Sequence, residues 1–289
     1  MADVPRPTGV LYVVATPIGN LEDVTLRALR VLAEVDLIAA EDTRRTAILL
    51  RHHGISTRQV SYYDAIERRR TPALVERMRA GARVALVTDA GTPGIADPGY
   101  HLVRGAIEAG IPVVPVPGAS AVTALVSVAG LPVDRFAFEG FLPARAAART
   151  ARLRALASEQ RALVFLEAGR RLSGFLKDAE AVLGDREAVM GRELTKVHEE
   201  QRRGRLSALR ARLDAADPVR GEVTIVVAGA PSAEAVASDT LDDAIREALA
   251  SGGSVREVSA ALAARFGLSR REIYRRALVL RSSLADQLR

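Results

Sequence analysis

Residues 87–99 read VTDAGTPGIADPG, and the architecture of the chain can be worked out from this stretch. The apolar run Val84–Val87 leads into it and is typical of a buried strand. Glycine and proline then recur at short intervals, which indicates that the chain leaves the strand in a tight turn. Asp89 stands at the carboxyl end of the predicted strand, where open parallel sheets bind their ligands. We therefore expect a parallel sheet with a ligand-binding turn at Asp89.

Two further turns of this type follow predicted strands. ATPIGN (Ala15–Asn20) follows the apolar run Leu11–Ala15, and VPGASA (Val116–Ala121) follows Val113–Val116. One such turn would carry little weight, because glycine and proline occur in all kinds of tight turn. Three of them, each after a strand, favour a single ligand site at one edge of the sheet.

Helical segments alternate with these strands in the first half of the chain. Leu37–Ala40 predicts another buried strand, while Tyr100–Ala109 and Ala119–Val128 predict helices. Asn20 is a favourable N-cap for a helix that carries leucines at helical spacing from Leu26 onward. This alternation predicts a mostly parallel sheet that is covered on both faces.

The second half of the chain has a different pattern, with helices placed less regularly between the strands. Gly204 is expected to form the turn of a hairpin between Glu199 and Leu206. A hairpin pairs antiparallel strands, so we predict a mixed sheet here. The predicted strands are Phe136–Glu139, Leu163–Glu167, Ala188–Leu194 and Glu222–Ala228, and helices are predicted near 145–158, 171–183 and 207–215.

The last part of the chain predicts a small helical unit. A stretch rich in alanine and serine follows Gly229, continues through Ser238 and is expected to be a linker, after which Thr240 caps a helix over Leu241–Ala250. Two capping boxes, S-x-x-E, predict two more helices with arginines on their polar face. Any two-helix hairpin would look like this, so nucleic-acid binding and a purely structural role both stay open. The capping boxes are Ser254 with Glu257 and Ser269 with Glu272, and the arginines are Arg265, Arg270, Arg271, Arg275 and Arg276.

We therefore predict three parts: an N-terminal α/β domain at 1–117, a mixed-sheet α/β domain at 118–230, and a helical extension at 231–289. One stretch, 111–133, has no charged residue and is long enough to span a membrane. Its prolines and glycines divide it into a strand, a turn and a helix, so it is interpreted as buried core. No signal peptide is predicted.

Composition limits the function without identifying it. Hydrophobic residues make up 48% of the chain, which is enough for more than one core, and the absence of cysteine excludes disulfides and thiolate metal sites. The four histidines show no metal-ligand spacing, so no metal is predicted. The net charge is +6, and 39 of the 41 basic residues are arginine. Arginine suits phosphate binding, but a GC-rich genome would produce the same bias.

The usual fingerprints of α/β enzymes are missing. The chain has no G-x-G-x-x-G, no G-x-x-x-x-G-K-[ST] and no G-x-S-x-G. A dinucleotide, a nucleoside triphosphate and a serine hydrolase mechanism therefore lack their common signatures. The ligand must be bound by another kind of turn.

Several motifs together resemble the tetrapyrrole methylase superfamily and, within it, the ribosomal RNA small subunit methyltransferase I branch. The resemblance covers about residues 9–230, and the helical tail is similar more loosely to the C-terminal extension of that family. One stretch departs from the pattern: Phe165–Arg171 keeps Glu167 and Arg171 but lacks the Ser, Pro and His of the usual Y-E-S-P-H-R segment, so no role of that histidine is carried over. The matching segments are VVATPIGNLEDVTLRAL (Val13–Leu29), AEDTR (Ala40–Arg44), VTDAGTPGIADPG (Val87–Gly99), PVPGASA (Pro115–Ala121), FEGFLP (Phe138–Pro143), RELTKVHEE (Arg192–Glu200) and GEVTIVVAG (Gly221–Gly229).

The resemblance implies a two-domain class III methyltransferase fold that binds S-adenosylmethionine between its domains, usually as a homodimer. It also implies 2′-O-methylation of a cytidine in 16S rRNA of the small ribosomal subunit, and hence a cytoplasmic enzyme with no membrane partner. Cofactor contacts carried over by motif are Pro17, Asp89, Ala90, Gly91, Ser120, Ala121, Leu142 and Leu166.

Methyl transfer to a ribose hydroxyl is helped by a base, because the hydroxyl holds its proton tightly at neutral pH. The arginines of the motifs are candidates for binding the phosphates that flank the target. Simple structural pairing, for example between Glu193 and Lys196, is an alternative for each of these groups. The candidate catalytic residues are Glu41, Asp42, Glu167, Glu193 and Lys196, and the candidate RNA-binding residues are Arg44, Arg171 and Arg192.

Three other functions remain open at this point. The same fold could methylate a small tetrapyrrole such as a corrin precursor. The helical tail could belong to a DNA-binding regulator, although this leaves residues 9–230 without a function. The chain could also be a ribosome assembly factor that transfers no methyl group.

Overall fold

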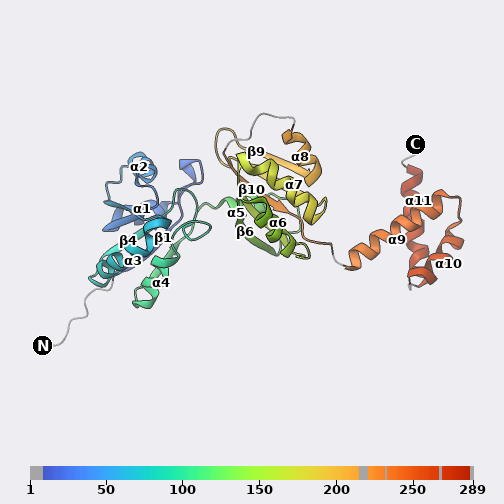
Figure 1. Ribbon diagram of the computed structural model, residues 1–289, viewed down its shortest axis with the longest axis horizontal. Coiled ribbons are helices and arrows are strands. Elements are labelled where there is room, and N and C mark those ends of the chain that lie inside the picture. The colour runs from blue at the N-terminus through green and yellow to red at the C-terminus, as the bar shows by residue number, and fades with distance from the viewer. Residues whose placement is uncertain (1–8, 215–220, 232, 267–268, 287–289) are drawn as a thin grey trace. The chain divides into compact units, whose positions relative to one another are not determined.

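The computed structural model describes residues 9–214, 221–231, 233–266 and 269–286. The chain divides into two compact units between Gly229 and Ala230. Two five-stranded sheets lie in the first unit, and the second unit is helical (Figure 1). The predicted α/β fold class with a small helical extension is confirmed.

The first sheet is parallel throughout, because every neighbouring pair of its strands runs in the same direction. Two inner strands are buried from both sides, since all residues of LIAA (37–40) and VALV (84–87) are inaccessible or nearly so. A continuous apolar run of this kind is what a two-sided parallel strand requires. The strand order is β3 (Gln59–Ser61), β2 (Leu37–Ala40), β4 (Arg83–Val87), β1 (Val10–Val14) and β5 (Val113–Val116).

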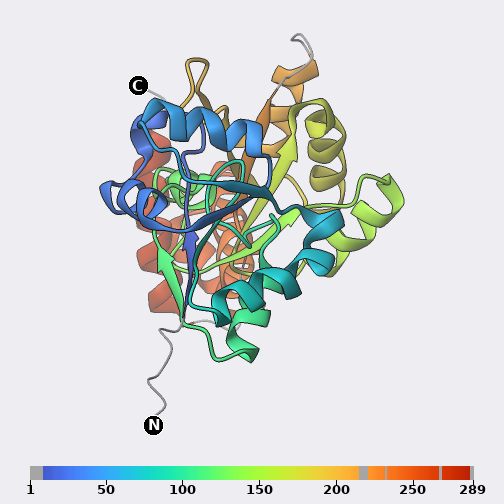
Figure 2. The same cartoon turned by 90° about the vertical axis from the view of Figure 1, so that its left-hand side faces the viewer.

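Helices cover both faces of this sheet. Helices α1 (Leu26–Glu34) and α2 (Thr43–His52) pack on the face that Ile38 and Ala40 share. Helices α3 (Asp64–Arg79) and α4 (Tyr100–Glu108) cover the opposite face. Figure 2 shows the strands between the blue helices α1 and α2 and the teal and green helices α3 and α4. The sheet therefore places its strand ends, and not its faces, within reach of a ligand.

Asn20 does not cap the helix for which it was predicted, but a short turn before it. Asn20 accepts a hydrogen bond from the Glu22 amide at 3.1 Å and caps a short 3-10 turn, Leu21–Asp23. Helix α1 begins later, where the Thr25 hydroxyl accepts from the Ala28 amide at 3.1 Å. The prediction that Asn20 caps the leucine-rich helix was wrong, because the extended backbone of Thr25 separates the two elements.

The second sheet is mixed, as predicted. Strands β6 and β7 are parallel, while β10 runs antiparallel to both β7 and β8, and β8 runs antiparallel to β9. Alternate residues of β7 face opposite cores, which is the pattern of a sheet covered on both sides. The strand order is β6 (Phe136–Phe141), β7 (Ala162–Ala168), β10 (Glu222–Val227), β8 (Glu187–Arg192) and β9 (Glu200–Arg205).

Helix α5 (Ala121–Ser127) packs on one face of the second sheet. Three helices cover the other face: α6 (Ala146–Ala155), α7 (Leu172–Leu183) and α8 (Leu206–Asp214). Phe165 of β7 and Phe175 of α7 lie at the centre of that core, with ring centroids 5.2 Å apart.

The hairpin of the second sheet turns earlier than predicted. Gly204 lies inside β9, opposite Ala188 of β8, and the turn is the loop 193–199 between the two strands. The prediction of a turn at Gly204 was wrong because glycine marks strand irregularities as well as turns. Two residues of the loop, Glu193 and Thr195, have positive φ angles of 49° and 66°.

The uncharged stretch 111–133 forms β5, a turn and α5, as its prolines and glycines predict. Among the described residues no helix has the length and apolar character needed to cross a bilayer. The predicted domain boundary at 117–118 falls in the turn between β5 and α5 and stays a prediction.

The second unit consists of three helices around a small apolar core. Helix α9 (Ala233–Ala250) is followed by α10 (Val255–Phe266) and α11 (Arg270–Asp286). The predicted linker and the predicted cap at Thr240 were wrong, because α9 already begins at Ala233 and so includes Thr240. Alanine is the strongest helix former, so a stretch rich in alanine favours a helix as readily as a linker.

The capping box at the start of α10 is confirmed. The Ser254 amide donates to the Glu257 carboxylate at 3.0 Å, and the Glu257 amide donates to the Ser254 hydroxyl at 3.3 Å. The side chain of Glu272, from the second predicted box, lies outside the described residues. Arg265 does so as well.

Phe175 provides a test of the second-sheet core. The substitution Phe175→Ala should lower the free energy of unfolding by about 3–5 kcal/mol, because it leaves a cavity under β7. Val197→Ala, at a side chain that is 96% exposed, should change it by less than about 0.5 kcal/mol. Urea unfolding of both variants measures the difference, and equal midpoints would contradict this description of the core.

Candidate functional site

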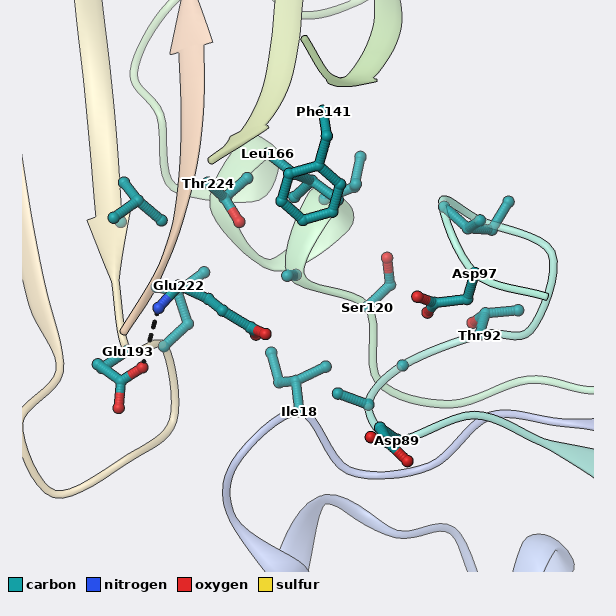
Figure 3. A pocket seen from close by; sticks show the side chains of 18 of the residues that line it. Ile18, Asp89, Thr92, Asp97, Ser120, Phe141, Leu166, Glu193, Glu222 and Thr224 are labelled. Atoms are coloured by element: carbon teal, nitrogen blue, oxygen red, sulfur yellow. Dashed lines mark hydrogen bonds between the residues drawn. The ribbon is translucent and has the colours of Figure 1, made fainter. Parts of the chain in front are cut away.

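A cavity lies between the strand ends of the first sheet and the edge of the second (Figure 3). It encloses about 200 Å³ and adjoins a second cavity of about 500 Å³, with Asp89, Glu193 and Lys196 in the walls of both. Figure 3 shows Phe141 and Leu166 on the wall opposite Ile18 and Asp89. The two sheets thus contribute opposite sides of one site.

The three predicted turns meet at this cavity. The turn after β1 pairs with the turn after β4, since the Thr16 amide donates to the Gly91 carbonyl at 2.9 Å and the Gly91 amide donates back at 3.0 Å. The Thr16 hydroxyl also donates to the Thr88 carbonyl at 3.0 Å. Ile18, Asp89 and Ser120 come from the three turns, and all of them line the cavity.

Glycine is favoured at position 91 by the backbone conformation there and not by a lack of space for a side chain. Its φ angle is +80°, in the left-handed region that favours glycine. A Cβ atom at this position would lie 3.6 Å from the Ile18 side chain, which is an ordinary contact. The turn therefore depends on a residue that can adopt this angle beside Asp89.

Asp89 and Glu41 connect the ends of β4 and β2. The Asp89 amide donates to the Glu41 carboxylate at 3.1 Å, and the Asp42 amide donates to the Asp89 carboxylate at 3.0 Å. Arg45 lies 3.4 Å from the second oxygen of Asp89. Burial raises the pKa of both carboxyls above their ordinary values, although the backbone hydrogen bonds and Arg45 oppose it.

Asp42 differs from its neighbour Glu41. Its carboxylate caps helix α2 and pairs with Arg44, accepting from the Arg44 amide at 2.8 Å and from the guanidinium at 2.7 Å. These hydrogen bonds lower the pKa of Asp42 well below its usual range. Since Asp42 lines neither cavity and is a weak base, this geometry favours other candidates for proton removal.

Asp97 is a site residue that the sequence reasoning missed. Its half-buried carboxylate lines the cavity and is turned toward Ser120 (Figure 3). It makes no hydrogen bond or ion pair with any described residue. Burial, followed by the nearby charges of Glu41 and Glu222, raises the pKa of Asp97 to about 7. The second aspartate in the quoted stretch was the available signal.

Glu167 lies on the second-sheet wall and is fully buried. One oxygen accepts from the Ala168 amide at 2.8 Å and lies 3.0 Å from the Arg171 guanidinium. The other oxygen has no partner among the described residues. Burial raises the pKa of Glu167 in spite of Arg171. Arg171 also donates to the Leu142 carbonyl at 2.5 Å, so its guanidinium is held inside the chain.

The loop 193–199 provides the third wall. Lys196 donates to the Glu193 carboxylate at 2.9 Å, and the Glu222 amide donates to the same oxygen at 3.2 Å. Burial alone would raise the pKa of Glu193, but these hydrogen bonds outweigh it and the pKa is lowered. Lys196 is a third exposed and ion-paired, so it lacks the burial that a role as a neutral amine requires.

The remaining candidates lie farther from the cavity. Arg44 is 89% exposed and pairs with Asp42, while Arg192 lies 3.5 Å from Glu200. Leu142 is buried beneath the site and lines neither cavity. Their predicted roles in cofactor and RNA binding stay predictions. The predicted residues that line the first cavity are Glu41, Asp89, Ala90, Gly91, Ser120, Ala121, Leu166, Glu167, Glu193 and Lys196, and Pro17 lines the second.

The carboxylates and apolar side chains that line the cavity suit a ligand that carries both a positive charge and an apolar group. Six carboxylates line it against only two basic side chains, Arg45 and Lys196. Apolar side chains such as Ile18, Phe141 and Leu166 complete the walls. The described residues contain no cluster with metal-ligand geometry. S-adenosylmethionine, which combines a sulfonium and an ammonium group with an adenine ring, fits such a site.

Relatives of this chain extend over nearly its whole length. A protein from Synechocystis sp. named ribosomal RNA small subunit methyltransferase I is 45% identical over 275 residues, which are 94% of this chain and 98% of that protein. A protein of the same name from Escherichia coli O157:H7 is 46% identical and covers 93% and 95% of the two chains. The chain belongs to the ribosomal RNA small subunit methyltransferase I family. It is therefore a methyltransferase, and this class of enzyme is confirmed.

The wider superfamily is shown by a second comparison. The sequence model of the tetrapyrrole (corrin/porphyrin) methylases matches residues 10–210. Among solved structures, the methyltransferase CobJ superposes with a TM-score of 0.58 at 20% identity, covering 77% of this chain and 95% of CobJ. Uroporphyrin-III C-methyl transferase from Thermus thermophilus, complexed with S-adenyl homocysteine, superposes with a TM-score of 0.54 at 22% identity, covering 75% and 97%. The predicted tetrapyrrole-methylase fold is confirmed.

Arg171 should stabilise the chain by compensating Glu167. In Arg171→Met, the buried carboxyl of Glu167 loses its ion pair, and its pKa should rise further. A carboxyl whose pKa is raised in the folded state makes the free energy of unfolding fall as the pH increases. The substitution should therefore lower the free energy of unfolding only slightly at pH 5. At pH 8 the loss should reach about 3 kcal/mol.

Urea unfolding at both pH values measures this loss. Arg170→Met is the matched control, because Arg170 is the exposed neighbour in sequence and should cost little at either pH. A loss in Arg171→Met that does not depend on pH would contradict the role of Arg171.

Proposed function

We propose that this chain transfers a methyl group from S-adenosylmethionine to the ribose 2′-hydroxyl of a cytidine in 16S rRNA. The small ribosomal subunit is the proposed carrier of that RNA, and the cytoplasm the proposed place of the reaction. The observation that carries the proposal is the identity of 44–50% to proteins named ribosomal RNA small subunit methyltransferase I. A homodimer is proposed from the family resemblance.

The cavity supports S-adenosylmethionine as the methyl donor. Ile18, Phe141 and Leu166 offer apolar surface for an adenine ring, and Asp89 and Asp97 offer carboxylates for hydroxyl or cationic groups. Ala90, Gly91 and the turn 120–121 line the same space. When bound, the cofactor supplies an electrophilic methyl group and leaves as a neutral thioether.

The residues of this chain would position the ribose and take up its proton. The cofactor would supply the methyl group to the 2′-oxygen, with the bond from sulfur to the methyl carbon breaking as the bond to oxygen forms, and a carboxylate of this chain would accept the hydroxyl proton. Glu41 and Glu167 line the cavity with pKa values raised by burial, which makes them better proton acceptors near neutral pH than Asp42 or Glu193. Exclusion of water and alignment of the two reactants would provide most of the acceleration.

The charge of the cavity limits which part of the RNA can enter. Six carboxylates would repel a phosphate, so the proposal places the ribose inside and the flanking phosphates at the rim. Arg44 and Arg192, which lie outside the cavity, are the arginines proposed for these contacts. This arrangement requires an unpaired nucleotide that can be turned out of its strand.

The reaction is tested with small subunits from cells that lack this methyltransferase. The protein and S-adenosylmethionine labelled in its methyl group should place label on the RNA, recovered after digestion as 2′-O-methylcytidine. Subunits from cells that contain the enzyme should accept none, because their target is already methylated. Label on a corrin precursor offered in parallel, with none on RNA, would replace the RNA by a tetrapyrrole as the substrate.

Asp97 should contribute to cofactor affinity in a pH-dependent way. With a pKa of about 7, its carboxyl gains charge between pH 6 and pH 8, so the affinity for cationic S-adenosylmethionine should rise over that range. Asp97→Asn should weaken binding about tenfold at pH 8 and remove this rise. Titration calorimetry with S-adenosylmethionine measures both effects.

Asp134→Asn is the control for this experiment, because Asp134 is highly exposed and lies outside both cavities. It should leave affinity and pH dependence unchanged. Unaltered binding in Asp97→Asn would show that the carboxylate does not face the cofactor.

A further inference from the structure

Helix α11 of the second unit has one buried side and one outward side. Ile273 and Ala277 are fully buried against α9 and α10, in the core of the three-helix unit. Figure 1 shows α11 beside both of these helices. Side chains three or four positions apart lie on one side of a helix, so the residues that follow Arg271 at these spacings form a continuous outward stripe.

This stripe combines arginine with aromatic and apolar side chains. Arg271, Tyr274, Arg275 and Leu278 follow one another at the spacing i, i+3, i+4 and i+7, and all four are exposed. Tyr274 and Leu278 keep 39% and 38% of their surface accessible, so both can contact a partner outside the chain. We call these four residues the α11 face.

Two other arginines of the same unit are paired with acids. Arg276 pairs with Asp242 of α9, and Arg246 lies 2.7 Å from Asp243. Among the described residues, neither Arg271 nor Arg275 makes a hydrogen bond or an ion pair with another side chain. These two cations lie one helical turn apart and have no ion-pair partner among the described residues, so they can bind an external anion.

We propose that the α11 face is a second RNA-binding surface, on which Arg271 and Arg275 bind backbone phosphates and Tyr274 stacks on an unpaired base. The proposal rests on the proposed function, because rRNA is the polymer that such a methyltransferase meets. It assigns to the helical unit a docking role that is separate from the chemistry of the cavity.

The chemistry of the stripe favours RNA over other partners. A guanidinium binds phosphate oxygens through two parallel hydrogen bonds and needs no sequence to do so. An exposed tyrosine between two arginines is typical of surfaces that bind single-stranded nucleic acid, where bases are free to stack. Duplex DNA keeps its bases stacked inside and would leave Tyr274 without a partner.

The test compares Arg271→Gln/Arg275→Gln with the wild-type chain, both at full length. The probe is unmodified 16S rRNA transcribed in vitro, and the readout is its dissociation constant over a series of salt concentrations. The variant should bind about tenfold more weakly near 0.1 M salt, and its slope of log K against log salt should fall by about 1.4, since each phosphate contact in a single strand contributes about 0.7. Tyr274→Ala should weaken binding at an unchanged slope.

Two control variants make the comparison specific. Arg69→Gln/Arg77→Gln removes the same charge from two exposed arginines of α3 and should leave the slope close to the wild-type value. Arg271→Lys/Arg275→Lys keeps the charge and should restore the slope. S-adenosylmethionine affinity, measured by calorimetry, should be the same in all variants and shows that the first unit is folded, and an unchanged helix content by circular dichroism shows the same for the helical unit.

Several results would overturn the proposal. A wild-type slope in Arg271→Gln/Arg275→Gln, or an equal loss in the α3 control, would mean that the α11 face binds no phosphate. Equal loss of binding to a DNA duplex would make DNA the partner, and a change in molecular mass without a change in RNA affinity would make it an interface between copies. Failure of the proposed function gives a different result, because the wild-type chain itself would then transfer no methyl group to RNA.

Discussion

The site depends on two backbone hydrogen bonds between Thr16 and Gly91. They join the turn after β1 to the turn after β4, and both turns then reach the same cavity. The left-handed backbone of Gly91 makes this pairing possible beside Asp89. Because β1 and β4 are parallel neighbours, this pairing continues their contact into the turns that carry Ile18 and Asp89. The second sheet then closes the cavity from the opposite side.

The distribution of charge separates two kinds of binding. The chain as a whole has a net charge of +6, but its cavity is lined by six carboxylates and two basic groups. An acidic interior favours a cationic donor and opposes phosphate, while an arginine-rich exterior favours a polyanion. Most arginines near the site are already paired with acids, as Arg44 and Arg171 are. The net charge alone therefore says little about where an anion would bind.

The parts of the fold with unambiguous local signals could be predicted from the sequence. The apolar runs of β1, β4 and β5 and the turns that follow them lie where they were expected. Caps and turns were less certain, since Asn20 and Gly204 each have a residue type that suits more than one place. Gly204 could have been placed correctly only with knowledge of its partner Ala188 on the neighbouring strand. The preference of glycine for turns does not reveal which residue it will pair with on a neighbouring strand.

The candidate site shows the same limit. Asp89, Ser120 and Leu166 were predicted from motifs and line the cavity, whereas Asp97 was missed. Its position depends on a turn whose path cannot be read from residue types. Arg171 was expected to face RNA, yet its guanidinium lies against Glu167 and Leu142. The carboxylate of Glu167, four residues earlier near the end of β7, attracts the guanidinium, and the burial of this carboxylate becomes visible only in the folded chain.

The strand order of the first sheet has a consequence for how the protein is made. Strand β1 is synthesised first, but its neighbours β4 and β5 begin more than seventy residues later. At a translation rate of about 5–20 residues per second, β1 waits for several seconds without either partner. During that interval its apolar side chains are open to contacts with other nascent chains. During translation, the exposed apolar residues of β1 are therefore a site at which a chaperone could bind and prevent aggregation.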